Sequence, residues 1–126
     1  MSSFTLDDIL NAVSIPLEID GVGFRLVPMS SRAIAAWNRV MFQEPEPGED
    51  GKVTLEARLD HADKQRDKQL QLLADHMRAS VTSGDAKKVT AKWLGDAVPQ
   101  VVLQDLAEFF VEGKRPAWAE GVASGN

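Results

Sequence analysis

The run Ile15-Pro-Leu-Glu-Ile-Asp-Gly-Val-Gly-Phe-Arg-Leu26 decides the fold of the first part of the chain. Apolar residues alternate on both sides of Asp20-Gly21, and such a two-residue connection is a strong signal for a β-hairpin with a type I′ turn. The alternation places six side chains on one apolar face: Ile15, Leu17, Ile19, Val22, Phe24 and Leu26. Pro16 lacks an N–H donor, which favours an edge position for the first strand. We therefore predict a β-hairpin at about 15–27, whose apolar face must rest on helices or on a partner.

Capping residues and helical periodicity predict the other elements. Thr5-Leu-Asp-Asp8 fits a capping box and predicts a short helix over about 6–12. Apolar residues at three-and-four spacing predict further helices from Ser30 or Ser31 to about Gln43, from Thr54 to about 82, from Thr90 to about 96, and over 99–112 with Pro99 as first residue. Gly84 and Gly113 follow the last residues of two of these helices, as C-terminal capping glycines do.

The long helix predicted after Thr54 has an unusual middle. Positions 63–69 contain no apolar residue, whereas Leu55, Leu59 and Ala62 precede them and a second apolar group follows. A helix of this length exceeds the width of a small domain. We therefore expect it to overhang the core, or to fray where it is polar, with the packed half at about 68–82.

Apart from the short helix at 6–12, these elements define a small, mainly α domain of about four helices with an N-terminal β-hairpin. Residues 1–113 hold all the predicted elements and form a single domain, consistent with a length of 126 residues. Residues 114–126 contain Pro, Gly and small residues and are expected to form a flexible C-terminal tail.

Composition excludes several classes of function. The chain has no cysteine, which rules out disulfides, thiol nucleophiles and cysteine-bound metals. It carries 14 Lys and Arg against 19 Asp and Glu, a net charge of −5. Nucleic-acid binding depends mainly on Lys and Arg contacts to phosphate, so no nucleic-acid partner is expected. No apolar run approaches the length of a membrane span, and no secretory signal begins the chain, so we expect no membrane association and a cytoplasmic location.

Much of the negative charge lies in one segment. Residues 44–52, Glu-Pro-Glu-Pro-Gly-Glu-Asp-Gly-Lys, contain four acids and one base. Its prolines and glycines prevent regular structure. The segment is either a solvated linker, which is the more common use of such residues, or an acidic docking loop.

Catalytic and cofactor motifs are missing from the sequence. His61 and His76 are fifteen positions apart, too far along one helix to share a metal, and are expected to face solvent. Gly21-Val-Gly23 lacks the third glycine of a dinucleotide loop and the Lys-Ser/Thr of a phosphate loop. We therefore predict no enzymatic activity, no cofactor and no metal site.

Aromatic side chains provide the candidates for partner binding. Trp118 lies in the predicted tail, where an exposed aromatic could anchor another chain. Phe109 and Phe110 point about 100° apart on their helix, so one of them is expected to be partly exposed. Trp93 lies beside the basic spot Lys87-Lys88 and Lys92, on a face that is otherwise apolar, and is a candidate for either the core or a partner contact.

The order of elements also carries a resemblance. A Phe4-Thr-Leu-Asp-Asp8 start, the hairpin from Pro16 to Ser30, a late Lys92-Trp-Leu94 and a terminal Pro99-x-x-Val-Leu-x-x-Leu106 follow one another over about 4–112. This layout resembles the tail assembly chaperones of long-tailed bacteriophages and prophages. The resemblance implies a non-enzymatic protein of the bacterial host cytoplasm that binds the tape measure protein. The chaperone would keep that protein soluble while tail tube proteins, a second candidate partner, polymerise around it.

A different class of function stays open beside the chaperone. A chain of this size and fold could also be a small structural protein of the virion, such as a head-to-tail connector or a tail-completion component. The two classes differ in one observable property, because a chaperone is absent from the finished particle whereas a structural component is part of it.

Overall fold

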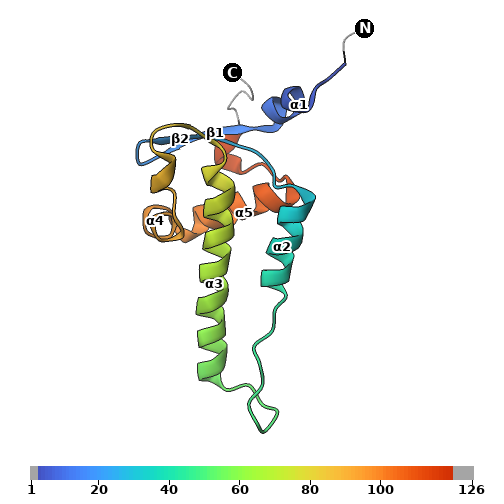
Figure 1. The fold of residues 1–126 in the computed structure, drawn as a ribbon, viewed down its shortest axis with the longest axis vertical. Helices are drawn as coiled ribbons and strands as arrows, with labels where there is room; N and C mark the ends of the chain where they lie inside the picture. Colours follow the sequence, from blue (N-terminus) through green and yellow to red (C-terminus); the bar gives the residue numbers. More distant parts are fainter. Residues whose placement is uncertain (1–2, 121–126) are drawn as a thin grey trace.

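The computed structural model describes residues 3–120, and the chain there is mainly helical with an N-terminal antiparallel β-hairpin (Figure 1). The elements in chain order are α1 Leu6–Val13, β1 Ile15–Ile19, β2 Val22–Leu26, α2 Ser31–Met41, α3 Leu55–Arg78, β3 Val81–Ser83, the 3-10 turn η1 Ala86–Lys88, α4 Ala91–Ala97, α5 Gln100–Glu112 and the 3-10 turn η2 Ala117–Ala119. The predicted fold class is thus confirmed.

The hairpin has the predicted register and turn. Ile15 pairs with Leu26 across the two antiparallel strands, and the alternating residues inward of them face one another in turn. Asp20 and Gly21 have φ values of 50° and 82°, the left-handed conformation that a type I′ turn requires. β1 lies at the edge of the sheet, as the missing N–H of Pro16 predicts.

Four helices begin at the residues that the sequence marks as N-caps. The hydroxyl groups of Thr5, Ser30, Thr54 and Thr90 each accept a hydrogen bond from the N–H three residues later. In α1 the cap is reciprocal, because the Asp8 carboxylate accepts from the Thr5 N–H at 3.0 Å. That hydrogen bond holds the pKa of Asp8 below its ordinary value of 3.8.

A third strand replaces the predicted end of the long helix. The prediction that this helix reaches about 82 is wrong, since α3 ends at Arg78 and Val81–Ser83 pair with β2. Ser80 turns the chain, because its N–H and its hydroxyl both donate to the Met77 carbonyl at 2.9 Å. The Ser80 carbonyl then accepts from the Arg25 N–H of β2 at 2.9 Å, which starts the new pairing.

The two halves of α3 differ in burial. Its buried residues are all in the C-terminal half, namely Leu73, Ala74 and Met77. In the N-terminal half Leu55 is 73% exposed and Leu59 is 59% exposed. The helix is continuous over 24 residues, a length of about 36 Å. Figure 1 shows its N-terminal half extending beyond the body of the domain, with the chain between α2 and α3 at its end. The overhang is confirmed, and the polar middle is helical.

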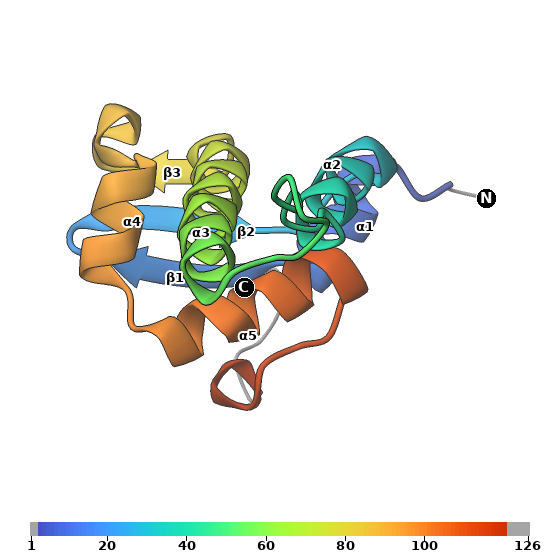
Figure 2. The ribbon, with the colours of Figure 1, turned by 90° about the horizontal axis from the view of Figure 1, so that it is seen from below.

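The core lies where α3, α4 and α5 cover one face of the sheet (Figure 2). Buried side chains from the strands meet buried side chains from these helices in one cluster, which includes Ile15, Val22, Phe24, Leu26, Leu73, Ala74, Met77, Leu94, Leu103, Leu106, Phe109 and Phe110. The hairpin therefore rests on helices of its own chain, as its marginal stability in isolation demands.

The last helix differs from its prediction by one residue at its start. Pro99 is the N-cap of α5 and not its first residue, because its ψ of 148° is extended and not helical. Gly113 ends α5 in the left-handed conformation, with φ of 73°, as predicted.

The segment after α5 packs back onto the domain as far as it is described. Pro116 and Ala119 are buried, and Ala117–Ala119 form η2. The expectation of a flexible tail over 114–126 is therefore corrected for the part up to Glu120, since the small Ala119 side chain fits into the core cluster. The remainder of that predicted tail, 121–126, lies outside the described residues.

Candidate functional site

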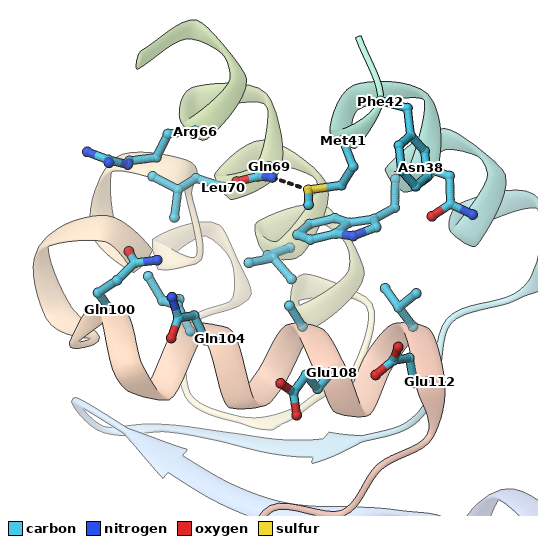
Figure 3. Close-up of a pocket in the computed structure, with 15 residues that line it drawn as sticks. Asn38, Met41, Phe42, Arg66, Gln69, Leu70, Gln100, Gln104, Glu108 and Glu112 are labelled. Atoms are coloured by element: carbon cyan, nitrogen blue, oxygen red, sulfur yellow. Dashed lines mark hydrogen bonds between the residues drawn. The ribbon is translucent and has the colours of Figure 1, made fainter. Parts of the chain in front are cut away.

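An open groove lies where α2 and α3 meet α5 (Figure 3). Its volume is about 660 Å³, which is within the range of ligand-binding clefts. The floor is apolar and consists of Trp37, Leu70, Leu73, Leu103, Ala107 and Val111. The rim is mainly polar and consists of Asn38, Arg66, Gln69, Gln100, Gln104, Glu108 and Glu112, with Met41 and Phe42 at the end of α2. An apolar floor with polar edges suits the apolar face of an amphipathic helix.

Helical spacing on α5 produces both the floor and one rim. Leu103, Ala107 and Val111 recur at every fourth residue and form an apolar row. The neighbouring row, from Gln100 to Glu112 at the same spacing, is polar and exposed. Because Ala107 has only a methyl group, the floor remains hollow between its two larger neighbours.

The end of α2 is held in place by polar side chains of α3. The Gln65 amide donates to the carbonyls of Val40 and Met41 at 2.8 and 3.1 Å, and the Gln69 amide donates to the Met41 sulfur (dashed in Figure 3). The last carbonyls of a helix have no partner within it, and the two Gln65 bonds satisfy those of Val40 and Met41. They also fix the backbone that carries Phe42, whose side chain is 80% exposed at the groove.

Two of the four predicted partner-binding residues are buried. Phe109 and Phe110 are 2% and 0% exposed, so the expectation that one of them is partly exposed is wrong. The Phe110 ring packs edge-on against His76 of α3, with the ring centroids 4.7 Å apart, and lies 5.8 Å from the Phe109 ring. Since α5 is covered on more than one side, neighbouring residues of the helix both enter the core.

The two predicted tryptophans lie apart from each other and from the groove. Trp93 is half-buried against Phe24, with ring centroids 6.4 Å apart, and its indole N–H donates to Asp20 at 3.3 Å. Trp118 is 41% exposed, and its indole N–H donates to Asp105 on α5 at 3.0 Å. The structure therefore brings together only Phe109 and Phe110 of the predicted set.

Asp20 at the hairpin turn accepts hydrogen bonds from two distant residues. The Lys88 ammonium lies 3.0 Å from its carboxylate and also donates to its backbone carbonyl at 2.9 Å. The Lys88 hydrogen bond, then the Trp93 hydrogen bond and the positive charge of Lys88, hold the pKa of Asp20 below its ordinary value of 3.8. A lowered pKa means that the folded state favours the charged carboxylate.

Stability should therefore depend on pH through Asp20. Its contribution is present above pH 3.8 and is lost as the pH falls through the lowered folded-state pKa. We expect Asp20→Asn to lower the Tm at pH 7, although asparagine is tolerated in the left-handed turn. The difference in Tm between the variant and the wild type should disappear once the pH is below the folded-state pKa of Asp20. Carboxyl NMR should give a midpoint for Asp20 below 3.8, and Lys88→Gln should move it back toward 3.8. A midpoint unaffected by Lys88→Gln would contradict the assignment.

The two histidines contact backbone carbonyls. This corrects the expectation that both side chains face solvent. The Nε2 atom of His61 lies 2.8 Å from the Gln43 carbonyl oxygen, and that of His76 lies 2.7 Å from the Val27 carbonyl oxygen. Within residues 3–120, no cluster of three or more His, Asp or Glu side chains is arranged to hold a metal ion. In the same range, no helix combines the length and the apolar character needed to cross a bilayer.

A second exposed apolar surface lies on α1. This helix has no buried residue, and its exposed side chains include Leu6 at 70%, Ile9 at 51% and Val13 at 39%. It lies next to β1 at the sheet end of the domain, away from the overhanging half of α3 (Figure 1). The α1 surface is therefore a useful comparison for the groove in mutational tests.

Sequence reasoning missed the groove residues. Met41, Phe42 and Arg66 come from segments that were assigned to the end of one helix and the polar middle of another. One signal was present, because Leu55 and Leu59 continue an apolar pattern into a half-helix expected to overhang the core. Apolar residues on an overhang have no core to join and therefore indicate an interface.

Comparison with protein-family models, with curated proteins and with solved structures finds no match for this chain.

Proposed function

We propose that the chain is a tail assembly chaperone of a long-tailed bacteriophage, which binds the tape measure protein and keeps it soluble during tail tube assembly. The observation that supports this most is the groove between α2, α3 and α5, open to solvent and apolar along its floor. The order of elements that resembles such chaperones is a second support. The role is non-enzymatic, and its place is the cytoplasm of the bacterial host.

The groove offers a physical basis for holding a client. An amphipathic helix can bury its apolar face on the floor while its polar flanks remain at the rim. Phe42 is the side chain best suited to contact such a helix, since it is large, 80% exposed and fixed at the groove. Exposed aromatic residues of this kind often contribute most of the energy of an interface.

Co-expression with the neighbouring tape measure protein tests the proposal. The wild-type chain should raise the soluble yield of that protein and co-purify with it. Phe42→Ser should reduce the co-purified amount by about tenfold or more, because loss of an aromatic anchor costs roughly 2 kcal/mol. The Tm should stay close to that of the wild type, since the Phe42 side chain is 80% exposed.

The control is Leu6→Ser/Ile9→Ser, which removes two exposed apolar side chains from α1. This variant should retain the wild-type effect. An unchanged soluble yield with the wild-type chain, or an equal loss in both variants, would refute the groove as the client site. Mass spectrometry of purified particles separates the chaperone from a virion structural protein, because the proposal requires the chain to be absent.

A further inference from the structure

The apolar floor of the groove continues along α3 onto the overhang. Six residues of α3 fall on one face, within an arc of about 80° at about 100° per residue, and we call them the α3 stripe: Leu55, Leu59, Ala62, Arg66, Leu70 and Leu73. Leu70 and Leu73 are part of the groove floor, whereas Leu55 and Leu59 are exposed. The stripe extends over about 27 Å, which is five turns of helix.

Carboxylates line one edge of this stripe. Glu56, Asp63 and Asp67 share an arc beside it, and we call them the acidic edge. Glu56 and Asp63 line a shallow hollow together with Leu59. None of the three is within ion-pair distance of a cation in the described part of the chain, whereas Asp60 between them pairs with Lys64 at 3.1 Å. At the groove end, Glu112 of α5 adds another carboxylate without an ion pair.

We infer that the stripe and its acidic edge bind one basic amphipathic helix, which lies along α3 from the groove to the N-terminal end of that helix. The apolar side of the bound helix covers the exposed leucines, and its Lys or Arg residues face the acidic edge. Unpaired carboxylates beside an apolar surface favour a cationic partner and speed its association. The inference rests on the proposed function only for naming the tape measure protein as the source of the helix.

Charge also argues against a second copy as the occupant. Two copies would bring together chains of net charge −5 each and double the number of carboxylates at the contact. Two cations lie at this surface: Arg58 is beside the stripe, and Arg66 is part of it. Arg66 has no ion pair among the described residues. The Arg66 stem can cover the stripe while its guanidinium pairs with an acidic residue of the bound helix.

Two synthetic peptides of about 18 residues, enough to span the stripe, test the inference against the full chain. Both have leucines at helical spacing, and they differ only in having Lys or Glu at the flanking positions. Fluorescence anisotropy should give a Kd at least about tenfold lower for the Lys peptide in about 50 mM NaCl, with the ratio falling toward one in about 0.5 M NaCl, because salt screens exposed charges.

Variants assign the effect to the surface. Glu56→Gln/Asp63→Asn/Asp67→Asn should abolish the preference for the Lys peptide and leave the Tm unchanged. The matched control is Asp7→Asn/Glu18→Gln/Glu120→Gln, which changes the net charge equally at exposed residues of other segments and should retain the preference. Leu55→Ser/Leu59→Ser should weaken binding of the Lys peptide without changing the Tm, since both leucines are exposed.

Three results would overturn the inference: equal binding of the two peptides, an equal effect of the matched control, or a concentration-dependent dimer that Leu55→Ser/Leu59→Ser abolishes. The outcome is separable from that of the proposed function. Peptide discrimination without any effect on the tape measure protein would retain the helix-binding surface and refute the chaperone. Co-purification of the tape measure protein without peptide discrimination would retain the chaperone and refute the basic-helix surface.

Discussion

Phe110→Ala is expected to lower the free energy of unfolding by about 3–5 kcal/mol, the usual cost of removing a buried aromatic ring from a core. The Phe110 side chain is fully buried and contacts His76 of α3. Its backbone carbonyl also accepts from the Met29 N–H at 2.7 Å, so the ring lies where α5, α3 and the chain after β2 meet. Because domains have total stabilities of roughly 5–15 kcal/mol, the variant should be close to unfolding at 37 °C.

Urea denaturation followed by tryptophan fluorescence measures this loss. The control is Val101→Ala on the same helix, where the valine is 64% exposed and the cost should be within about 0.5 kcal/mol. A loss below about 1 kcal/mol for Phe110→Ala would mean that the ring is not part of the core.

Gly84→Ala should also destabilise the domain strongly, by about 2–4 kcal/mol, because strain and a backbone clash act together. The sequence predicts that Gly84 follows a helix, but in the structure it follows β3. Its φ is 85°. An added Cβ would lie 2.7 Å from the Gly21 carbonyl oxygen and 3.1 Å from the Val22 Cα. Both atoms belong to the backbone of the hairpin, which cannot move aside without breaking strand pairing.

Gly21→Ala provides the matched control for this prediction. Gly21 has a similar φ of 82°, but a Cβ added there meets no atom within 4 Å. Gly21→Ala should therefore lower the free energy of unfolding only by the strain of a left-handed alanine, about 1–2 kcal/mol. Thermal and urea denaturation of the two variants measure the difference, and equal losses would contradict the close packing of Gly84 on the hairpin turn.

The predictions that held depend on neighbours in the sequence. The hairpin follows from Asp20-Gly21 between alternating residues, and the helix starts follow from hydroxyl groups that accept from an N–H three residues later. Such contacts involve residues within one turn of each other, so their geometry is readable from the sequence.

The predictions that failed depend on distant contacts. β3 has only three residues, and its pairing with β2 was invisible in a run that has helical spacing and lacks Gly or Pro. Burial of both Phe109 and Phe110 required knowing that α5 is covered on more than one side. Docking of Ala119 required a space in a core that the sequence does not describe.

The candidate site also depends on contacts between residues that are distant in the sequence. The groove combines residues of α2, α3 and α5, of which α2 and α5 are about sixty residues apart in the chain. No local pattern marks such a set, because a groove is the space that helices leave between them. The sequence could indicate only that an overhanging half-helix carries two leucines without a core to join.

By itself the sequence determined where the helices and the hairpin begin, which residues cap them, and that the chain is acidic and without cysteine. Short-range hydrogen bonds and steric limits on the backbone act within a few residues and suffice for these features. Only the tertiary structure decided which apolar residues are buried and which remain exposed along α3. Burial depends on how complete elements pack against one another. The apolar residues that this packing leaves exposed form the surface proposed to bind a partner.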